Sequence, residues 1–197
     1  GLTGSAKADL WLKGPMDDPF DPSALDWRLT ATLDGVSSSK PIDGRAIADA
    51  DLVVTADPSG MTAKGTAKVE GITADIDIKQ SFTGPQTATS GVEFVLTEAD
   101  RKAKGVDLGT LLTGPVGVTL VAHSDGSQDV SVDLTKAAIT LPGIGWTKGA
   151  GVEAQAAFKL RPGPAGGYQV RDFEATSEGV DVAGQFDISK AGEVVSA

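Results

Sequence analysis

The sequence has no cysteine and a single histidine among its 197 residues. Without cysteine there are no disulfides, thiolate metal sites or cysteine nucleophiles, and this absence suits the cytoplasm and the periplasm equally. A catalytic triad or zinc site built on His123 would need a nucleophile or further ligands that its sequence neighbours do not supply. We therefore expect His123 to be an ordinary residue at a strand end.

Long apolar runs and clusters of positive charge are also missing. No stretch of 18 or more apolar residues is present to span a bilayer, and the chain starts without an initiator methionine or a signal-peptide pattern. We expect a segment of a larger protein, whose membrane contacts lie in parts absent from this chain. The net charge of -10 opposes nucleic-acid binding and adsorption to anionic membranes, so contact with lipid would have to be apolar.

Aromatic residues make up only 5% of the chain, against 40% apolar residues overall. A carbohydrate-active enzyme would present a carboxylate pair beside exposed aromatic rings. Trp11, Trp27, Trp146 and Tyr168 are too few for a sugar-binding platform. We assign no catalytic residue, cofactor or metal, and expect a protein that is not an enzyme.

Three groups of aspartates are conceivable Ca²⁺ ligands, but none has the spacing of a calcium-binding loop. We interpret the first as a polar loop and the other two as solvated strand faces. The groups are Asp17, Asp18 and Asp21; Asp49 and Asp51; and Asp75 and Asp77.

The sequence is rich in strand-like alternation. Ile72, Ala74, Ile76 and Ile78 alternate with polar residues, a pattern typical of a half-buried strand. In residues 46–54 the even-numbered positions are all apolar, and we expect them to share one face. Turn-forming residues at 34–35, 43–44, 57–60, 124–126 and 162–167 separate the strands. Only residues 98–104 have helical propensity, sufficient for one or two turns.

The pattern predicts an all-β protein, a long, curled antiparallel sheet of at least ten strands that forms an open hydrophobic groove. We expect one elongated segment over 1–197, with 1–90 and 91–197 as candidate pseudo-repeat halves. The apolar face must be covered by a second sheet, by closure or by a ligand. An ordinary β-sandwich core is one interpretation. The other, which the small side chains favour, is a trough for acyl chains.

The residues expected to line this groove are the larger apolar members of the alternating strands. They are Leu29, Leu33, Leu52, Val54, Val69, Ile72, Ile76, Ile78, Phe82, Phe94, Leu96, Val118, Leu120, Val130, Val132, Leu134, Val152, Phe158 and Leu160.

Residues 134–160 carry the most specific motif, a Leu-Pro-x-x-Gly-Trp-x-Lys run from Leu141 to Lys148. This run, with the strand–glycine–strand patterns around Gly71 and Gly179, resembles the AsmA-like family of Gram-negative envelope proteins, especially its YhdP-type and TamB-type members. The resemblance implies a periplasmic β groove, in a parent protein anchored in the inner membrane, that carries phospholipid between the inner and outer membranes. The implied partners are phospholipid acyl chains and neighbouring segments of the same full-length protein. The alternative is a structural or adhesive β-sandwich module of a cell-envelope protein.

Overall fold

The computed structural model describes residues 1–15, 25–40, 45–84, 88–105, 107–163, 166–190 and 194–196. The chain forms two compact units, Gly1–Val92 and Glu93–Ala197, and the boundary falls within strand β6 (Ala88–Leu96). Antiparallel strands dominate both units, which confirms the prediction of an all-β protein with at least ten antiparallel strands.

Three predicted features lie outside the described residues. They are the loop with Asp17, Asp18 and Asp21, the turn at 43–44, and positions 164–165 of the expected turn at 162–167.

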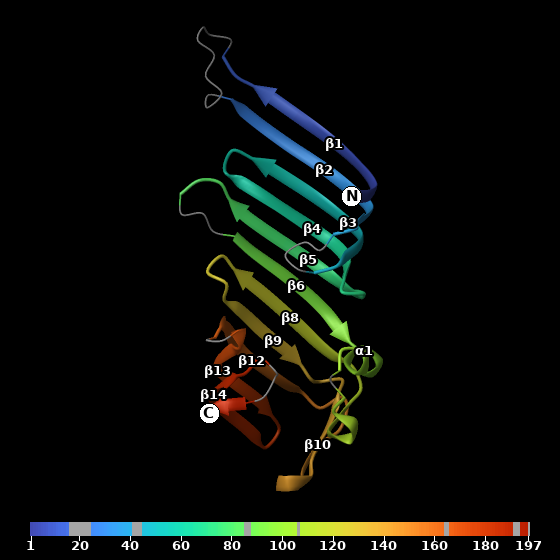
Figure 1. The fold of residues 1–197 in the computed structure, drawn as a ribbon, viewed down its shortest axis with the longest axis vertical. Helices are drawn as coiled ribbons and strands as arrows, with labels where there is room; N and C mark the ends of the chain where they lie inside the picture. The colour runs from blue at the N-terminus through green and yellow to red at the C-terminus, as the bar shows by residue number, and fades with distance from the viewer. Residues whose placement is uncertain are drawn as a thin grey trace. The chain divides into compact units, whose positions relative to one another are not determined.

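The first unit consists of long strands that lie side by side in chain order (Figure 1). Each pairs antiparallel with the next. Before β6 they are β1 (Leu2–Lys13), β2 (Asp26–Ser38), β3 (Ile47–Asp57), β4 (Gly60–Val69) and β5 (Ile72–Ser81). Strands of ten residues or more are roughly 30 Å or more in length, at about 3.4 Å per residue.

Two tight turns determine the register of β3, β4 and β5. Between β3 and β4, the Asp57 carboxylate accepts the backbone N–H of Ser59 at 2.7 Å and of Gly60 at 3.2 Å. Between β4 and β5, Glu70 and Gly71 have φ values of 52° and 83°. Two consecutive positive φ values are typical of the hairpin turn whose twist matches that of its strands. The hairpins predicted at these positions are confirmed.

Strand β2 contains a bulge where the sequence predicts a turn. The register with β3 shifts between Leu33 and Val36, and Gly35 has a φ of 58°. The Gly35 N–H donates to the Asp51 carboxylate of β3 at 2.8 Å. The expectation that Asp34 and Gly35 end the strand is wrong, because a glycine with positive φ also serves a bulge within a continuing strand.

A second bulge, in β3, exchanges the faces expected for residues 46–48. The register shifts after Ala48, and Asp49 has a φ of 48°. Ala48 lies opposite Lys68, whereas Ile47 lies opposite Val69. Directly opposite residues project to the same side of a sheet. Ile47 therefore belongs to the apolar face, and the expectation for positions 46 and 48 is wrong.

Glycines allow the backbones of neighbouring strands to approach closely near these bulges. At Gly65, with φ 149°, a β-carbon would lie 2.0 Å from the Asp51 carbonyl oxygen. At Gly4, with φ 113°, it would lie 2.7 Å from the Gly35 carbonyl oxygen. Bulges and glycine kinks bend strands and increase their twist. Strands β1 to β4 thus share a line of backbone distortion that favours a curved sheet.

The second unit contains one larger and one smaller antiparallel sheet. Its larger sheet has the neighbours β8, β9, β12, β13, β14 and β15 in that order. Its smaller sheet has the order β11, β10, β7, of which β10 is labelled in Figure 1. The strands are β7 (Leu112–Thr113), β8 (Val116–His123), β9 (Gln128–Asp133), β10 (Ala138–Leu141), β11 (Trp146–Lys148), β12 (Ala154–Pro162), β13 (Tyr168–Ser177), β14 (Val180–Ile188) and β15 (Val194–Ser196). The hairpin of β8 and β9 was predicted, but the smaller sheet was not.

Short helical segments occur in the connections of the second unit. They are α1 (Glu98–Ala103) and the 3-10 turns η2 (Gly109–Leu111) and η3 (Pro142–Ile144). Helix α1 begins with a capping box, in which the Thr97 hydroxyl accepts the Asp100 N–H and the Asp100 carboxylate accepts the Thr97 N–H. The prediction of one or two helical turns in residues 98–104 is confirmed.

Two buried cations hold these connections together. Arg101, only 5% exposed, donates to the carbonyl oxygens of Gly114 at 2.7 Å and Leu112 at 3.2 Å. Lys148, 4% exposed, donates to the Ala137 carbonyl at 2.7 Å. Hydrogen bonds from charged donors are stronger than neutral ones, so each cation stabilises the loop that surrounds it.

Candidate functional site

The apolar side chains of the first unit form a strip across strands β1 to β5. One row consists of Leu33, Leu52, Gly65 and Ile76, each opposite the next across β2 to β5. Neighbouring rows of opposite residues on the same strands place the other predicted lining residues on the same side of the sheet. These are Leu29, Val54, Val69, Ile72 and Ile78. The register therefore brings together the side chains that alternation assigned to one face.

The large side chains of this strip remain partly exposed. Leu33, Leu52 and Ile76 are half-buried, and Phe82, just after β5, is 41% exposed. The buried members are small, such as Ala74 at 2% exposure. In the described part of the first unit all strands belong to one sheet, so no second layer covers the strip. In a β-sandwich the inward side chains of both sheets form the core between them.

The second unit repeats this arrangement on its larger sheet. Leu120 lies opposite Val130, and Val130 lies opposite Phe158. Val130 is buried. The other predicted lining residues of this unit are half-buried, namely Phe94, Leu96, Val118, Leu120, Val132, Leu134, Val152, Phe158 and Leu160.

An aromatic cluster lies on this face of the second unit. The ring of Phe173 is centred 6.1 Å from that of Phe158 and 5.8 Å from that of Phe186. Phe173 is absent from the predicted lining residues, because the odd–even alternation of β13 changes phase at a bulge between Val170 and Phe173. Asp172, within that bulge, has a φ of 51°. If the alternation were unbroken along the whole strand, Phe173 would lie on the polar face.

The opposite face of the first unit is polar and ion-paired. Lys64 bonds to Asp77 at 3.0 Å, and Lys68 bonds to Asp49 at 2.8 Å. The hydrogen bond from Lys64 lowers the pKa of Asp77, aided by the nearby Lys79 charge. In the second pair, the hydrogen bond to Asp49 raises the pKa of Lys68. These exposed pairs support the interpretation of the aspartates as a solvated face.

An open cavity of about 580 Å³ lies on this polar face, near the turn between β3 and β4. Thr30, Thr55, Thr62 and Lys79, which form one row across β2 to β5, contribute to its wall. The lining also includes Leu29 of the predicted acyl-chain strip, together with Ala56 and Met61.

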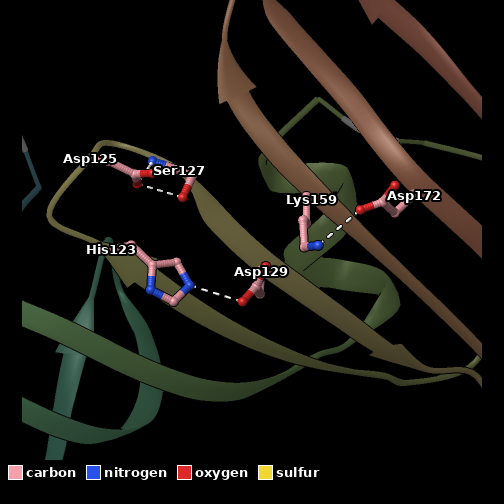
Figure 2. Close-up of polar contacts among 6 residues, drawn as sticks. All are labelled: His123, Asp125, Ser127, Asp129, Lys159 and Asp172. Atoms are coloured by element: carbon pink, nitrogen blue, oxygen red, sulfur yellow. Dashed lines mark hydrogen bonds and ion pairs between the residues drawn. The ribbon is translucent and has the colours of Figure 1, made fainter.

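The polar face of the second unit carries a row of polar side chains (Figure 2). His123, the last residue of β8, contacts Asp129 at 2.9 Å. Lys159 bonds to Asp172 at 2.9 Å and lies opposite Asp129 in the register. This bond raises the pKa of Lys159 and lowers that of Asp172. The Ser127 hydroxyl donates to Asp125 and not to the histidine, so the row does not form a nucleophile–histidine pair.

Within the described ranges, no group of three or more histidine or acidic side chains has the geometry of a metal site. Among those same residues, no helix is long and apolar enough to cross a membrane. Comparisons with protein-family models, with curated proteins and with solved structures find no match to this chain.

Proposed function

We propose that this chain binds lipid acyl chains along the apolar faces of its sheets, as a periplasmic segment of an AsmA-like protein that moves phospholipid between the inner and outer membranes. The observation that carries the proposal is the uncovered strip of the first unit, where Leu33, Leu52 and Ile76 share one face and stay half-buried. The Leu141 to Lys148 motif supports the family assignment.

The energy of covering this strip is sufficient for lipid binding. Removing about 300 Å² of apolar surface from water contributes roughly 7.5 kcal/mol at ~25 cal/mol per Å². Immobilising the lipid costs part of this, so we expect reversible binding. In the described residues the strip is a broad surface of mostly aliphatic side chains, and we expect acyl chains to slide along it.

The charge distribution keeps the headgroup in water. The two faces differ sharply, since Lys64, Lys68 and Asp77 lie on the side away from the strip. With a net charge of -10, the protein does not attract anionic headgroups strongly. We therefore expect little headgroup selectivity.

Extraction of the purified protein with organic solvent, followed by mass spectrometry, tests for bound phospholipid. The proposal predicts co-purifying phospholipid and saturable uptake of a fluorescent phospholipid by the delipidated protein. A structural or adhesive sandwich predicts neither, and their joint absence refutes the proposal.

Single charges in the strip test the location of binding. Ile76→Asp and Leu120→Asp should each reduce lipid uptake strongly, because an acyl chain cannot lie on an unpaired carboxylate without a desolvation cost. Thr73→Asp and Thr119→Asp are the matched controls on the opposite faces. Equal losses of uptake in test and control variants, at equal thermal stability, would rule out the strip as the binding surface.

A further inference from the structure

The smaller sheet of the second unit carries an exposed apolar tip, which we define by four side chains. Leu108 and Leu111 belong to the turn around η2, and Leu141 and Ile144 belong to the turn around η3. Strand β10 runs to one end of the second unit, where η3 continues from it and η2 lies beside it (Figure 1). All four side chains are exposed, Ile144 by 72%. Exposed apolar side chains gathered in one place mark an interaction site.

The two segments that form the tip contain no charge. Residues 108–122 and 137–147 include no acidic, basic or histidine side chain, although charged residues make up 22% of the chain. Lys136 and Lys148 bound the second segment, so the first charges on either side of it are positive. A charged side chain is costly in hydrocarbon, and a tip without charges avoids this cost.

The backbone of the tip is held from below and closed on itself. Arg101 donates to the carbonyl oxygens of Leu112 and Gly114, and Lys148 donates to that of Ala137. Strands β10 and β11 pair as far as Leu141 and Trp146. Beyond this pair, the Gly145 N–H donates to the Pro142 carbonyl at 3.2 Å. Internal hydrogen bonds of this kind are what a segment needs where water is absent.

The size of the tip favours a lipid surface over a protein partner or a second copy. Four partly exposed aliphatic side chains present about 300 Å² of apolar surface, less than half of the roughly 800 Å² that each partner buries in a stable interface. A bilayer needs no matching surface, because each side chain inserts independently. Trp146, half-buried at the base of the tip, is of the residue type enriched where a membrane meets water.

We propose that this tip inserts into the surface of a lipid bilayer, with Leu141 and Ile144 among the upper acyl chains and Trp146 at headgroup level. The sequence alone led us to expect membrane contacts only in parts outside this chain, whereas this contact lies within it. With a net charge of -10 the chain gains no electrostatic attraction to anionic lipid, so the insertion is apolar and reversible. This contact goes beyond acyl-chain binding by the strip and does not depend on it.

Flotation of the chain with phosphatidylcholine vesicles tests the proposal. The wild type should float with the vesicles, equally well with and without about 0.5 M sodium chloride, because salt screens only charge interactions. Ile144→Asp should lower the partition coefficient about tenfold. Val53→Asp is the matched control and should bind as the wild type does, since Val53 is also exposed and lies opposite Lys64 on the polar face of the first unit. Circular dichroism verifies that both variants fold.

A fluorescent label at the tip locates the inserted residue, since the chain has no cysteine of its own. Ile144→Cys carrying an environment-sensitive nitrobenzoxadiazole label should shift its emission to the blue when vesicles are added. Phospholipid with a nitroxide on its acyl chain should then quench it. The same label on Val53→Cys should show neither change.

The proposal is overturned if the wild type does not float, or if Ile144→Asp and Val53→Asp lower the partition coefficient equally. It is also overturned if vesicles leave the emission of the label at position 144 unchanged. A blue shift that appears without vesicles as the protein concentration rises contradicts it too, because a second copy then covers the tip.

Discussion

The substitution Gly65→Ala tests whether the close strand approach at Gly65 shapes the sheet. The added methyl group would lie 2.0 Å from the Asp51 carbonyl oxygen and 3.0 Å from the Asp51 carbonyl carbon and the Leu52 α-carbon. All three atoms are backbone, so no side-chain rotation relieves the clash. Strands β3 and β4 would have to separate by about 1 Å or more to reach ordinary contact distances.

The matched control is Gly71→Ala, in the turn between β4 and β5. Gly71 also has positive φ, 83°, but its added methyl group would meet nothing within 4 Å. The control therefore measures backbone strain alone, about 1–2 kcal/mol. Gly65→Ala adds the clash and weakened ladder hydrogen bonds, and we expect a total loss of about 3–4 kcal/mol.

Urea denaturation followed by circular dichroism measures both free energies of unfolding. We also expect Gly65→Ala to reduce fluorescent-lipid uptake in conditions where the protein remains folded, whereas Gly71→Ala should not. Equal stability losses in the two variants, within about 0.5 kcal/mol, would refute the reasoning about this contact.

Three further predictions concern the second unit and the ion pairs. Phe173→Ala should destabilise the protein by about 2 kcal/mol, since it removes two ring contacts and a half-buried side chain; calorimetry measures this, and a loss like that of an exposed-residue variant would contradict it. Lys148→Met should cost about 1–3 kcal/mol in urea denaturation because it leaves buried carbonyls without their donor, and a neutral result would contradict that role. Lysine partners lower the pKa values of Asp77 and Asp172 in the folded state. The two ion pairs therefore stabilise the fold fully above the unfolded-state pKa of about 3.9, and this stabilisation is lost as the pH falls through the lower folded-state pKa values. The urea concentration at the unfolding midpoint should therefore decrease when the pH is lowered below about 4, and this decrease should be smaller in Asp172→Asn than in the wild type.

The strands and their two faces were largely predictable, because successive side chains of a strand point alternately to opposite faces of the sheet. Alternation identified the strip row by row wherever the backbone was regular, as at Ile76 and Leu120. It failed where one extra residue changes the phase. The bulges at Gly35, Asp49 and Asp172 have positive φ values, and a single sequence does not distinguish such a bulge from a turn or a regular strand residue.

The buried cations and the smaller sheet could not be predicted for a different reason. Arg101 and Lys148 accept burial because backbone segments 11 to 13 residues away in the sequence place carbonyl oxygens around them, and residues of any type carry such oxygens. The run from Leu141 to Lys148 was recognised as a motif, but the hairpin of β10 and β11 pairs with Thr113 and Leu112, which lie 25 and 27 residues before their partners Ala138 and Ile139. Such long-range partners leave no local periodic signal.

Two tryptophans on opposite sides of the first unit allow a direct measurement of where acyl chains lie. Trp27 lies opposite Leu12 on the apolar strip, whereas Trp11 lies opposite Arg28, whose guanidinium is 5.7 Å from its ring centre. The measurement uses two variants, one with Trp27 and one with Trp11 as its sole tryptophan. Phospholipid with brominated acyl chains should quench the fluorescence of Trp27 and leave that of Trp11 unchanged. Quenching of Trp11 alone, or of neither residue at saturating lipid, would contradict an acyl-chain surface on this strip.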